Sequence, residues 1–303
     1  MHVTITGATG TIGSRLVSRL LERGDEVTVL SRDVHRAGQA LPGAQAVVWD
    51  PQRDPAPASA LAGRDAVVNL AGAPVFQRWT MDAKREITRS RITTTDHLVA
   101  GIGIVRAADR PAVLVSGSAS GFYGDAGNRV LDEGAAPAHD FLGGVASGWE
   151  QAAREAGELG LRVITIRTGL VLAADGGALP QLARPIRFGA ASWLGNGRQY
   201  VPWIHVDDHV GILLAAIDHA SFRGPINASA PEPATNRELT KAVGKVLRRP
   251  VLFGAPAPLI RMALGERAAL VLDSCRMIPG RADDLGYRFV HPQLDEALRD
   301  LLG

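Results

Sequence analysis

Three glycines near the start of the chain have the spacing that binding of a dinucleotide requires. Gly7, Gly10 and Gly13 follow a β-branched run at 3–6 and precede leucines and valines at helical spacing. In such a strand–turn–helix unit the first glycine permits a tight turn, the second lets the backbone approach a pyrophosphate, and the third lets the helix pack on the strand. The free N–H groups of the helix then face the phosphates, although a plain turn without a ligand is the alternative. The residues expected to bind the dinucleotide here are Gly7, Gly10, Thr11, Ile12 and Gly13.

The end of the second expected strand distinguishes the two nicotinamide dinucleotides. NAD sites usually place an acid there to bind the ribose 2′-hydroxyl, whereas an arginine accommodates a 2′-phosphate. Arg32 follows Ser31 at this position, and its planar guanidinium suits a phosphate; Arg36 lies one helical turn further on. Asp33 lies one position too late for the ribose. These residues favour NADPH over NADH.

Polar and small residues follow three further expected strands. Asp50 ends the third strand, where its carboxylate can accept from the adenine amino group. Leu70, Ala71 and Gly72 follow Asn69 at the end of the fourth strand, where small residues let the backbone pass the ribose. We assign Thr168, after the sixth strand, to the cofactor as well. The carboxyl ends of parallel strands share one edge of a sheet, so these residues trace a single crevice.

The elements that position these residues are strands alternating with helices. Continuous apolar runs indicate strands that are buried on both faces, and the alternation indicates parallel β–α–β units. The sequence therefore predicts an α/β fold with a Rossmann-type doubly wound parallel sheet. The expected strands are 3–6, 27–30, 46–49, 66–70, 112–115, 162–166 and 225–230, and the main helices are 14–23, 57–61, 81–105 and 145–159.

The pattern changes after Arg167 and indicates a small C-terminal substrate-binding lobe. Glycines and aromatics at 188–201 indicate a loop or a short hairpin, and Asn236 can cap a helix over 237–247. We expect a nucleotide-binding domain at 1–170, to which 201–230 returns. The lobe would then consist of 171–200 and 231–303.

Composition narrows the class of protein. The 303 residues carry a formal net charge of +2, so no field for nucleic acid or for a membrane surface is indicated. The one cysteine, Cys275, cannot form an internal disulfide, and no signal peptide or apolar membrane span is evident. We expect a cytoplasmic monomer or homodimer that acts on a small molecule and contains no metal.

The motifs together resemble the short-chain dehydrogenase/reductase superfamily, in its extended and atypical members. The glycine loop is similar to the family's TGxxGxxG, and 69–72 to its NNAG element. Segments 115–124 and 203–208 are similar to the serine-bearing strand and the IHVxD segment of sugar epimerases. More narrowly, the branch known as epimerase family proteins is indicated by the elements at 89–91, 140–142, 149–150, 167–169, 195–203, 264–266 and 286–292.

The resemblance implies catalysis by a serine with a Tyr-x-x-x-Lys pair, and here the chain departs from the family. Alignment on Trp149 places Ala146 at the tyrosine position and Glu150 at the lysine position. Ala146 cannot transfer a proton, so the usual relay is absent. Ser118 and Ser116 remain as candidate catalytic hydroxyls that could donate to a developing alkoxide.

The resemblance and the missing relay leave three functions open. The first is an NADPH-dependent ketoreductase of atypical mechanism that reduces an aromatic, polyketide-type carbonyl; simocyclinone-type angucyclinone ketoreductases are similar in lacking the Tyr/Lys pair. The second is a nucleotide-sugar epimerase or dehydratase, and the third is a non-catalytic NADPH-binding protein. Aromatic side chains would form flat walls for a planar substrate, although lobe packing is their commoner role. They are Phe76, Trp79, Tyr123, Trp193 and Trp203.

Overall fold

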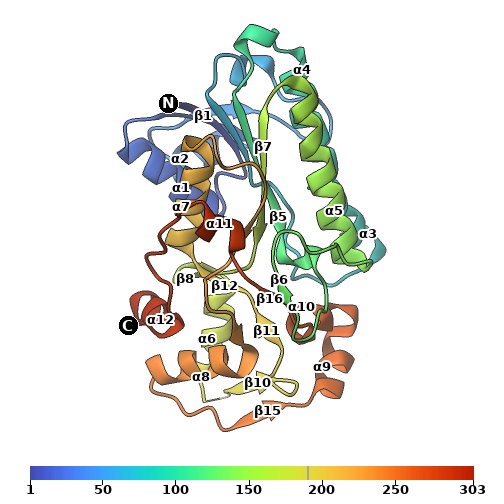
Figure 1. The fold of residues 1–303 in the computed structure, drawn as a ribbon, viewed down its shortest axis with the longest axis vertical. Coiled ribbons are helices and arrows are strands. Elements are labelled where there is room, and N and C mark those ends of the chain that lie inside the picture. Colours follow the sequence, from blue (N-terminus) through green and yellow to red (C-terminus); the bar gives the residue numbers. More distant parts are fainter. Residues whose placement is uncertain (190) are drawn as a thin grey trace.

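A parallel sheet occupies one half of the molecule and a smaller lobe the other (Figure 1). The computed structural model describes residues 1–189 and 191–303. Seven strands form the main sheet in the order β13-β7-β5-β4-β1-β2-β3, all parallel. Their bounds are β1 (His2–Thr6), β2 (Glu26–Ser31), β3 (Gln45–Val48), β4 (Ala66–Asn69), β5 (Val113–Ala119), β7 (Arg162–Thr168) and β13 (Gly224–Ala228).

This order confirms the predicted fold class and the seven predicted strands. The strand order reverses between β1 and β4, which is the point where open α/β sheets bind their ligands. The glycine loop follows β1 directly, so the topology places it at this point.

Helices cover both faces of the sheet, and each face has its own apolar core. Leu16 and Leu20 pack on one face, and Leu98 and Ile102 on the other; all four are fully buried. The first face carries α1 (Thr11–Glu22), α2 (Val34–Ala40), α7 (Val206–Asp218) and α11 (Gly280–Asp284). The second carries α4 (Ile92–Ile104), α5 (Phe141–Arg154) and the short 3-10 helices η1 (Ala58–Ala60) and η4 (Glu155–Leu159).

The predicted helix over 81–105 is wrong in one respect, because it is two helices. α3 (Met81–Arg89) ends at Ser90, and α4 begins after Arg91. Ser90 Oγ accepts from the Ala73 N–H at 2.9 Å, and Arg91 Nη1 donates to the Ala73 carbonyl at 3.1 Å. Both residues of the break therefore hold the loop that follows β4.

The helix predicted over 145–159 begins earlier than expected. Asp140 caps α5 by accepting from the Gly143 N–H at 2.8 Å, so the helix starts at Phe141. Its α-helical part ends at Arg154, where η4 continues to Leu159 before Gly160 at φ 91°.

Short strands and helices build the smaller lobe. Among the described residues of segment 188–201, β10 (Ser192–Leu194) pairs with β15 (Phe253–Ala255) and β11 (Tyr200–Val201) pairs with β14 (Ala234–Thr235), so these residues do not form the predicted short hairpin. Thr235, rather than Asn236, caps α8 through a capping box with Glu238, while Asn236 Oδ1 accepts from the Leu194 N–H. The strands are β8 (Leu170–Ala173), β9 (Gly176–Gly177), β10 (Ser192–Leu194), β11 (Tyr200–Val201), β12 (Trp203–His205), β14 (Ala234–Thr235) and β15 (Phe253–Ala255). The helices are α6 (Leu179–Arg187), α8 (Asn236–Val246), α9 (Ala257–Leu264), η5 (Gly265–Ala268), α10 (Ala269–Leu272) and α12 (Leu294–Leu302).

The last fifty residues cross between the lobe and the sheet. Ala282 belongs to the apolar core of the sheet, with Leu285, Tyr287 and Phe289 packed against it, although the predicted division assigned 231–303 to the lobe. A small two-stranded pairing of β6 (Val130–Leu131) with β16 (Arg276–Met277) and the 3-10 helices η2 (Ala107–Asp109) and η3 (Ser120–Phe122) complete the described elements. None of the helices in the described part of the chain combines the length and the apolar composition that a bilayer span requires.

Candidate active and cofactor site

The glycine loop has the close approaches for which glycine was expected. Gly7 has φ 77°, and a methyl group added there would lie 2.5 Å from the Leu70 carbonyl carbon. A methyl group at Gly13 would collide with the Gly7 oxygen and Ala8 Cα. Gly10 is the N-cap of α1 and supplies no side-chain cap, so the first N–H groups of α1 are available to a ligand.

The 2′-phosphate assignment fits the surroundings of β2. Arg32 is exposed directly after this strand, and Arg36 is exposed in the first turn of α2. The carboxylate of Asp33 caps α2 by accepting from the Arg36 N–H at 3.0 Å, while Ser31 Oγ accepts from the Asp33 N–H. The acid nearest to the expected ribose position is therefore engaged in the start of a helix.

The other predicted cofactor residues lie at successive strand ends. Leu70 and Ala71 touch Gly7, as the crevice requires. Asp50 Oδ1 accepts from the Gln52 N–H at 3.1 Å, so part of its carboxylate serves a local turn. Thr168 Oγ1 lies 2.9 Å from His209 Nε2 beneath the end of β7.

Neither candidate serine presents a free hydroxyl. Ser118 is 3% exposed and donates to Glu150 Oε1 at 2.8 Å. Ser116 is fully buried, accepts from Asn69 Nδ2 at 3.4 Å and donates to the Gly117 carbonyl at 3.3 Å. Ser116 therefore lies inside the sheet rather than at a reacting centre, and a catalytic role for Ser118 stays a prediction.

Glu150 takes part in a bidentate ion pair that the sequence did not reveal. Arg167 Nε donates to Glu150 Oε1 at 2.7 Å, and Nη2 donates to Oε2 at 3.0 Å. The side chains are 4% and 1% exposed, and the guanidinium lies 3.6 Å from the centroid of the Phe122 ring. Burial opposes the charge of Arg167, yet the bonds from Glu150 leave its pKa above the ordinary arginine value. The charge of Glu150 is therefore paired with the charge of Arg167 inside the protein.

Tyr123 belongs to the same buried network. Its hydroxyl donates to Asn227 Oδ1 at 2.6 Å and accepts from Arg167 Nη1 at 2.9 Å. Burial raises the pKa of Tyr123 to about 12. The phenol is 3% exposed, so it does not form a wall of an open pocket, as the sequence had suggested.

The four remaining aromatic candidates do not lie on one wall. Trp203 is fully buried in the lobe core and donates to the Glu232 carbonyl, so the prediction that it forms a substrate wall is wrong. Trp193 stacks under Arg237 in the lobe. Phe76 is exposed, and Trp79 is partly buried.

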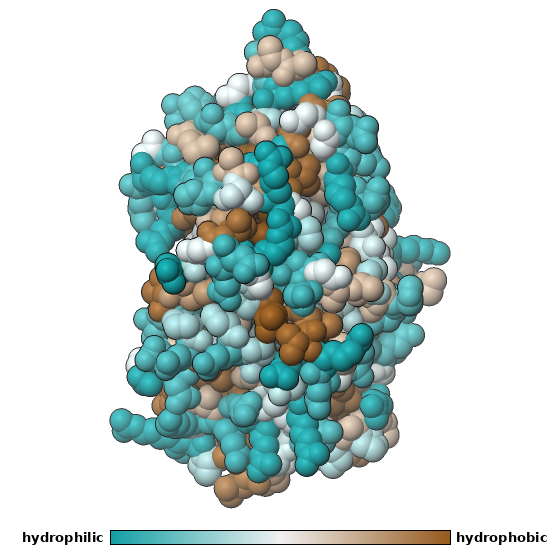
Figure 2. Space-filling view, in the orientation of Figure 1, coloured by the Kyte–Doolittle hydropathy of each residue, from teal (hydrophilic) through white to brown (hydrophobic). Residues whose placement is uncertain are grey.

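Trp79 marks a place where the nucleotide domain meets the lobe. Its ring packs edge-on against Phe141 at 5.2 Å between centroids, and Lys84 Nζ lies over both rings. Lys84 also pairs with Glu266 of η5, which belongs to the C-terminal segment. The face drawn in Figure 2 is mainly hydrophilic, with apolar side chains gathered near its middle, between the two halves of the molecule.

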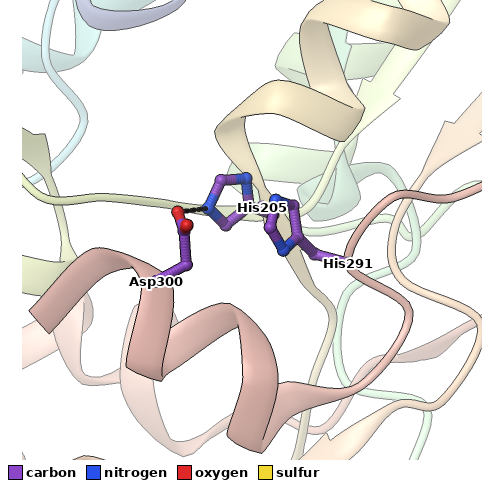
Figure 3. Close-up of side chains that lie close together, drawn as sticks. All are labelled: His205, His291 and Asp300. Carbon is purple, nitrogen blue, oxygen red and sulfur yellow. Dashed lines mark ion pairs between the residues drawn. The ribbon is translucent and has the colours of Figure 1, made fainter. Parts of the chain in front are cut away.

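A histidine cluster at the start of α7 stands apart from this crevice (Figure 3). His205 Nε2 lies 3.3 Å from Asp300 Oδ2, and its ring lies 3.8 Å from that of His291. His205 Nδ1 accepts from the Asp207 N–H at 3.1 Å and caps α7. Since a neutral imidazole that accepts at Nδ1 carries its proton on Nε2, the protonated nitrogen lies near Asp300, although it makes no hydrogen bond among the described residues. This tautomer does not offer Nε2 to a metal.

Comparisons with known proteins agree with this geometry. The family model "NAD dependent epimerase/dehydratase family" matches residues 3–228, and "Domain of unknown function (DUF1731)" matches 255–301. The chain is 38% identical over 310 residues to the chloroplastic epimerase family protein SDR39U1 homolog of Arabidopsis thaliana, covering 100% of this chain and 87% of the relative.

Two solved structures extend the likeness. The crystal structure of human epimerase family protein SDR39U1 with NADPH has a TM-score of 0.88 and 32% identity, covering 100% of this chain and 99% of that one. A nucleoside-diphosphate sugar epimerase from Corynebacterium glutamicum has a TM-score of 0.78 and 32% identity, covering 100% of this chain and 58% of that one. The resemblance to the epimerase branch of atypical short-chain dehydrogenases/reductases is thereby confirmed, and the chain belongs to the NAD-dependent epimerase/dehydratase family.

Proposed function

We propose that this protein binds NADPH in the crevice at the carboxyl ends of β1, β2 and β4 and reduces the carbonyl group of a small molecule. The glycine loop offers the pyrophosphate site, and exposed Arg32 and Arg36 offer cations for the 2′-phosphate. The human relative crystallised with NADPH supports this choice of cofactor. When bound, NADPH supplies the hydride, while the chain supplies position and electrostatics.

The observation that carries the proposal is the set of contacts made by the Glu150 carboxylate. At the family's lysine position stands an acid whose two oxygens are held by Arg167, with a further bond from Ser118. Ala146 at the tyrosine position has no proton to give. Loss of a general acid costs about 10²- to 10⁴-fold in rate, so reduction is slowed rather than abolished.

A substrate that carries its own proton donor suits such a site. A ketone next to a phenol has an internal hydrogen bond that polarises the carbonyl and can deliver a proton to the alkoxide. We therefore place an aromatic, polyketide-type ketone at the junction marked by Trp79 and Phe141, where flat side chains meet the lobe. The chain would act as a monomer or a homodimer.

A nucleotide-sugar epimerase or dehydratase is the second candidate. The name of the matched family and the similarity to the sugar epimerase of Corynebacterium glutamicum favour it. That chemistry begins with removal of a proton from a sugar hydroxyl, for which a base is needed. Neither Ala146 nor the paired Glu150 supplies one, and we therefore rank it second. A non-catalytic NADPH-binding protein is the third candidate, consistent with the same two residues.

One assay separates the three. The protein is mixed with NADPH and a panel of aromatic ketones with and without a neighbouring phenol, and separately with nucleotide sugars, while NADPH absorbance and products are followed. Oxidation of NADPH by the phenol-bearing ketones is expected. Conversion of a sugar would favour the second function, and tight NADPH binding without any turnover would favour the third. Failure to bind NADPH would overturn the proposal.

A further inference from the structure

Arg91 lies against the backbone that borders the proposed cofactor crevice. Its Nη1 donates to the carbonyls of Ala73 and Ile87, each at 3.1 Å. A methyl group added at Gly72 would lie 3.0 Å from Cζ of Arg91 and 3.1 Å from Nη2. Leu70 touches Gly7, the first glycine of the loop, and Gly72 follows two positions later. The Arg91 guanidinium therefore lies beside the same backbone segment that contacts the glycine loop.

This guanidinium has no carboxylate partner in the described part of the chain. Only Nη1 has acceptors there, so Nε and Nη2 are left as donors. Burial lowers the pKa of Arg91 to about 10, with no acid nearby to raise it. Arg167, by contrast, donates hydrogen bonds to both carboxylate oxygens of Glu150. A partly desolvated cation without a counter-ion is costly, which points to an anion that comes from a ligand.

Trp149 provides a second unused donor next to Arg91. Its ring centroid lies 5.3 Å from Arg91 Cζ, and the residue is 6% exposed. The indole Nε1 is buried and has no hydrogen-bond partner among the described residues. A methyl group at Gly117 would lie 2.7 Å from Trp149 Cη2, so the ring lies against the end of β5. Buried N–H groups without acceptors are rare in folded proteins.

We propose that Arg91, with the indole N–H of Trp149, forms an oxyanion-binding site at the ends of β4 and β5. Arg91 lies against Gly72, which follows β4, and Trp149 lies against Gly117 of β5. The ligand group is a phosphate or carboxylate oxygen, supplied by the pyrophosphate of the cofactor or by an acidic substituent of the substrate. The inference rests on the proposed function, because it requires a ligand in this crevice.

Calorimetric titration of four variants tests the site. Arg91→Gln removes the charge, Arg91→Lys keeps it, and Trp149→Phe removes the N–H but keeps a ring. Arg89→Gln is the matched control, since Arg89 is exposed two positions away. NADPH and adenosine 2′-monophosphate, which lacks both phosphates of the pyrophosphate, probe the cofactor. Benzoate added to the NADPH-saturated protein probes the substrate side. Thermal unfolding of each variant verifies folding.

Because a charge-assisted hydrogen bond is lost, Arg91→Gln should bind the ligand that carries the oxyanion about ten- to hundredfold more weakly than the parent protein. Arg91→Lys should restore part of this affinity, and Trp149→Phe should lose less of it than Arg91→Gln. If the oxyanion is the pyrophosphate, the affinity of Arg91→Gln for NADPH falls and its affinity for adenosine 2′-monophosphate does not. If the oxyanion belongs to the substrate, the affinity of Arg91→Gln for benzoate falls and its affinity for NADPH does not. Affinities for NADPH and benzoate within about twofold of the parent protein in Arg91→Gln would overturn the inference while leaving the proposed function intact. A parent protein that binds no NADPH would overturn both.

Discussion

Glu150 and Arg167 form a bidentate ion pair, with both side chains almost completely buried between α5 and the end of β7. The pair explains why an acid is tolerated where the family has a lysine. The cation of the site lies on β7, where it holds Glu150, the Tyr123 hydroxyl and the Glu133 carbonyl. It is therefore not free to bind a ribose or to lower the pKa of a catalytic tyrosine.

Breaking this pair from one side should be strongly destabilising. Glu150→Gln leaves the Arg167 charge buried and only partly compensated, so we expect a loss of about 3–5 kcal/mol in the free energy of unfolding. Urea denaturation measures it. Glu155→Gln, an exposed acid just beyond α5, should change stability by less than about 0.5 kcal/mol. A loss from Glu150→Gln no larger than that of this control would contradict the assigned role.

The phosphate assignment predicts an asymmetric effect on the two cofactors. Arg32→Ala should weaken NADPH binding by about 1.5–3 kcal/mol, because a charge-assisted contact is lost. NADH has no 2′-phosphate, so its affinity should change little. Titrations with both cofactors decide the matter, with Arg19→Ala, an exposed arginine on α1, as the control. Equal weakening of NADH would show that Arg32 does not bind the 2′-phosphate.

Two glycines of the loop should respond differently to the same substitution. Gly10 has φ −79°, and a methyl group there would lie 3.4 Å from the Gly7 oxygen, so Gly10→Ala should fold and lose NADPH affinity. Gly13→Ala must displace backbone at Gly7 and Ala8, and we expect a loss of about 1–3 kcal/mol in stability.

Thermal denaturation and NADPH titration of both variants test this contrast. Gly144→Ala is the control, because nothing lies within 4 Å of a methyl group added there. It should raise stability by about 0.5–1 kcal/mol through the preference of helices for alanine. The loop geometry would be incorrect if Gly10→Ala bound NADPH like the parent protein.

Stability should fall in mild acid because of a buried imidazole. Burial lowers the pKa of His209 to about 4, and the residue is fully buried. The unfolded chain therefore binds a proton at this histidine near pH 6.5, whereas the folded chain binds it only near pH 4. The stabilising contribution of the neutral imidazole is complete above pH 6.5 and is lost as the pH falls from there towards 4. Between pH 7.5 and 5 the expected loss is about 2 kcal/mol.

His205 also contributes to the loss of stability in acid, because burial and the charge of His291 lower its pKa. Urea denaturation at both pH values measures the slope, and His209→Gln should flatten it. An unchanged slope in that variant would exclude His209 as its source.

The sheet was predictable from sequence, and the polar contacts of the site were not. Continuous apolar runs bounded by glycine or polar residues locate all seven strands, because strands buried on both faces tolerate little else. The break at Ser90 and Arg91 carries no proline or glycine, so only its contacts with Ala73 reveal it. Glu150 and Arg167 are 17 positions apart, and only the packing of α5 against β7 joins them.

Aromatic residues illustrate the same limit. The sequence marks Trp203 and Trp79 alike as candidate walls, yet one is in the lobe core and the other lies at the junction. Residue type predicts an apolar contact but does not distinguish a substrate from another side chain. The carbonyl of Glu232, which accepts from Trp203, comes from 29 positions away.

Transfer of deuterium from the cofactor shows whether the protein moves hydride from NADPH to a carbonyl without a tyrosine–lysine relay. The protein is incubated with NADPH deuterated at C4 of the nicotinamide and a ketone that bears a neighbouring phenol, and the product is analysed by mass spectrometry. We predict an alcohol with one deuterium on the former carbonyl carbon, formed also by Ser118→Ala at a reduced rate. If NADPH binds but no ketone in the panel gains deuterium, the protein is not a ketoreductase for these substrates and the proposed function is wrong.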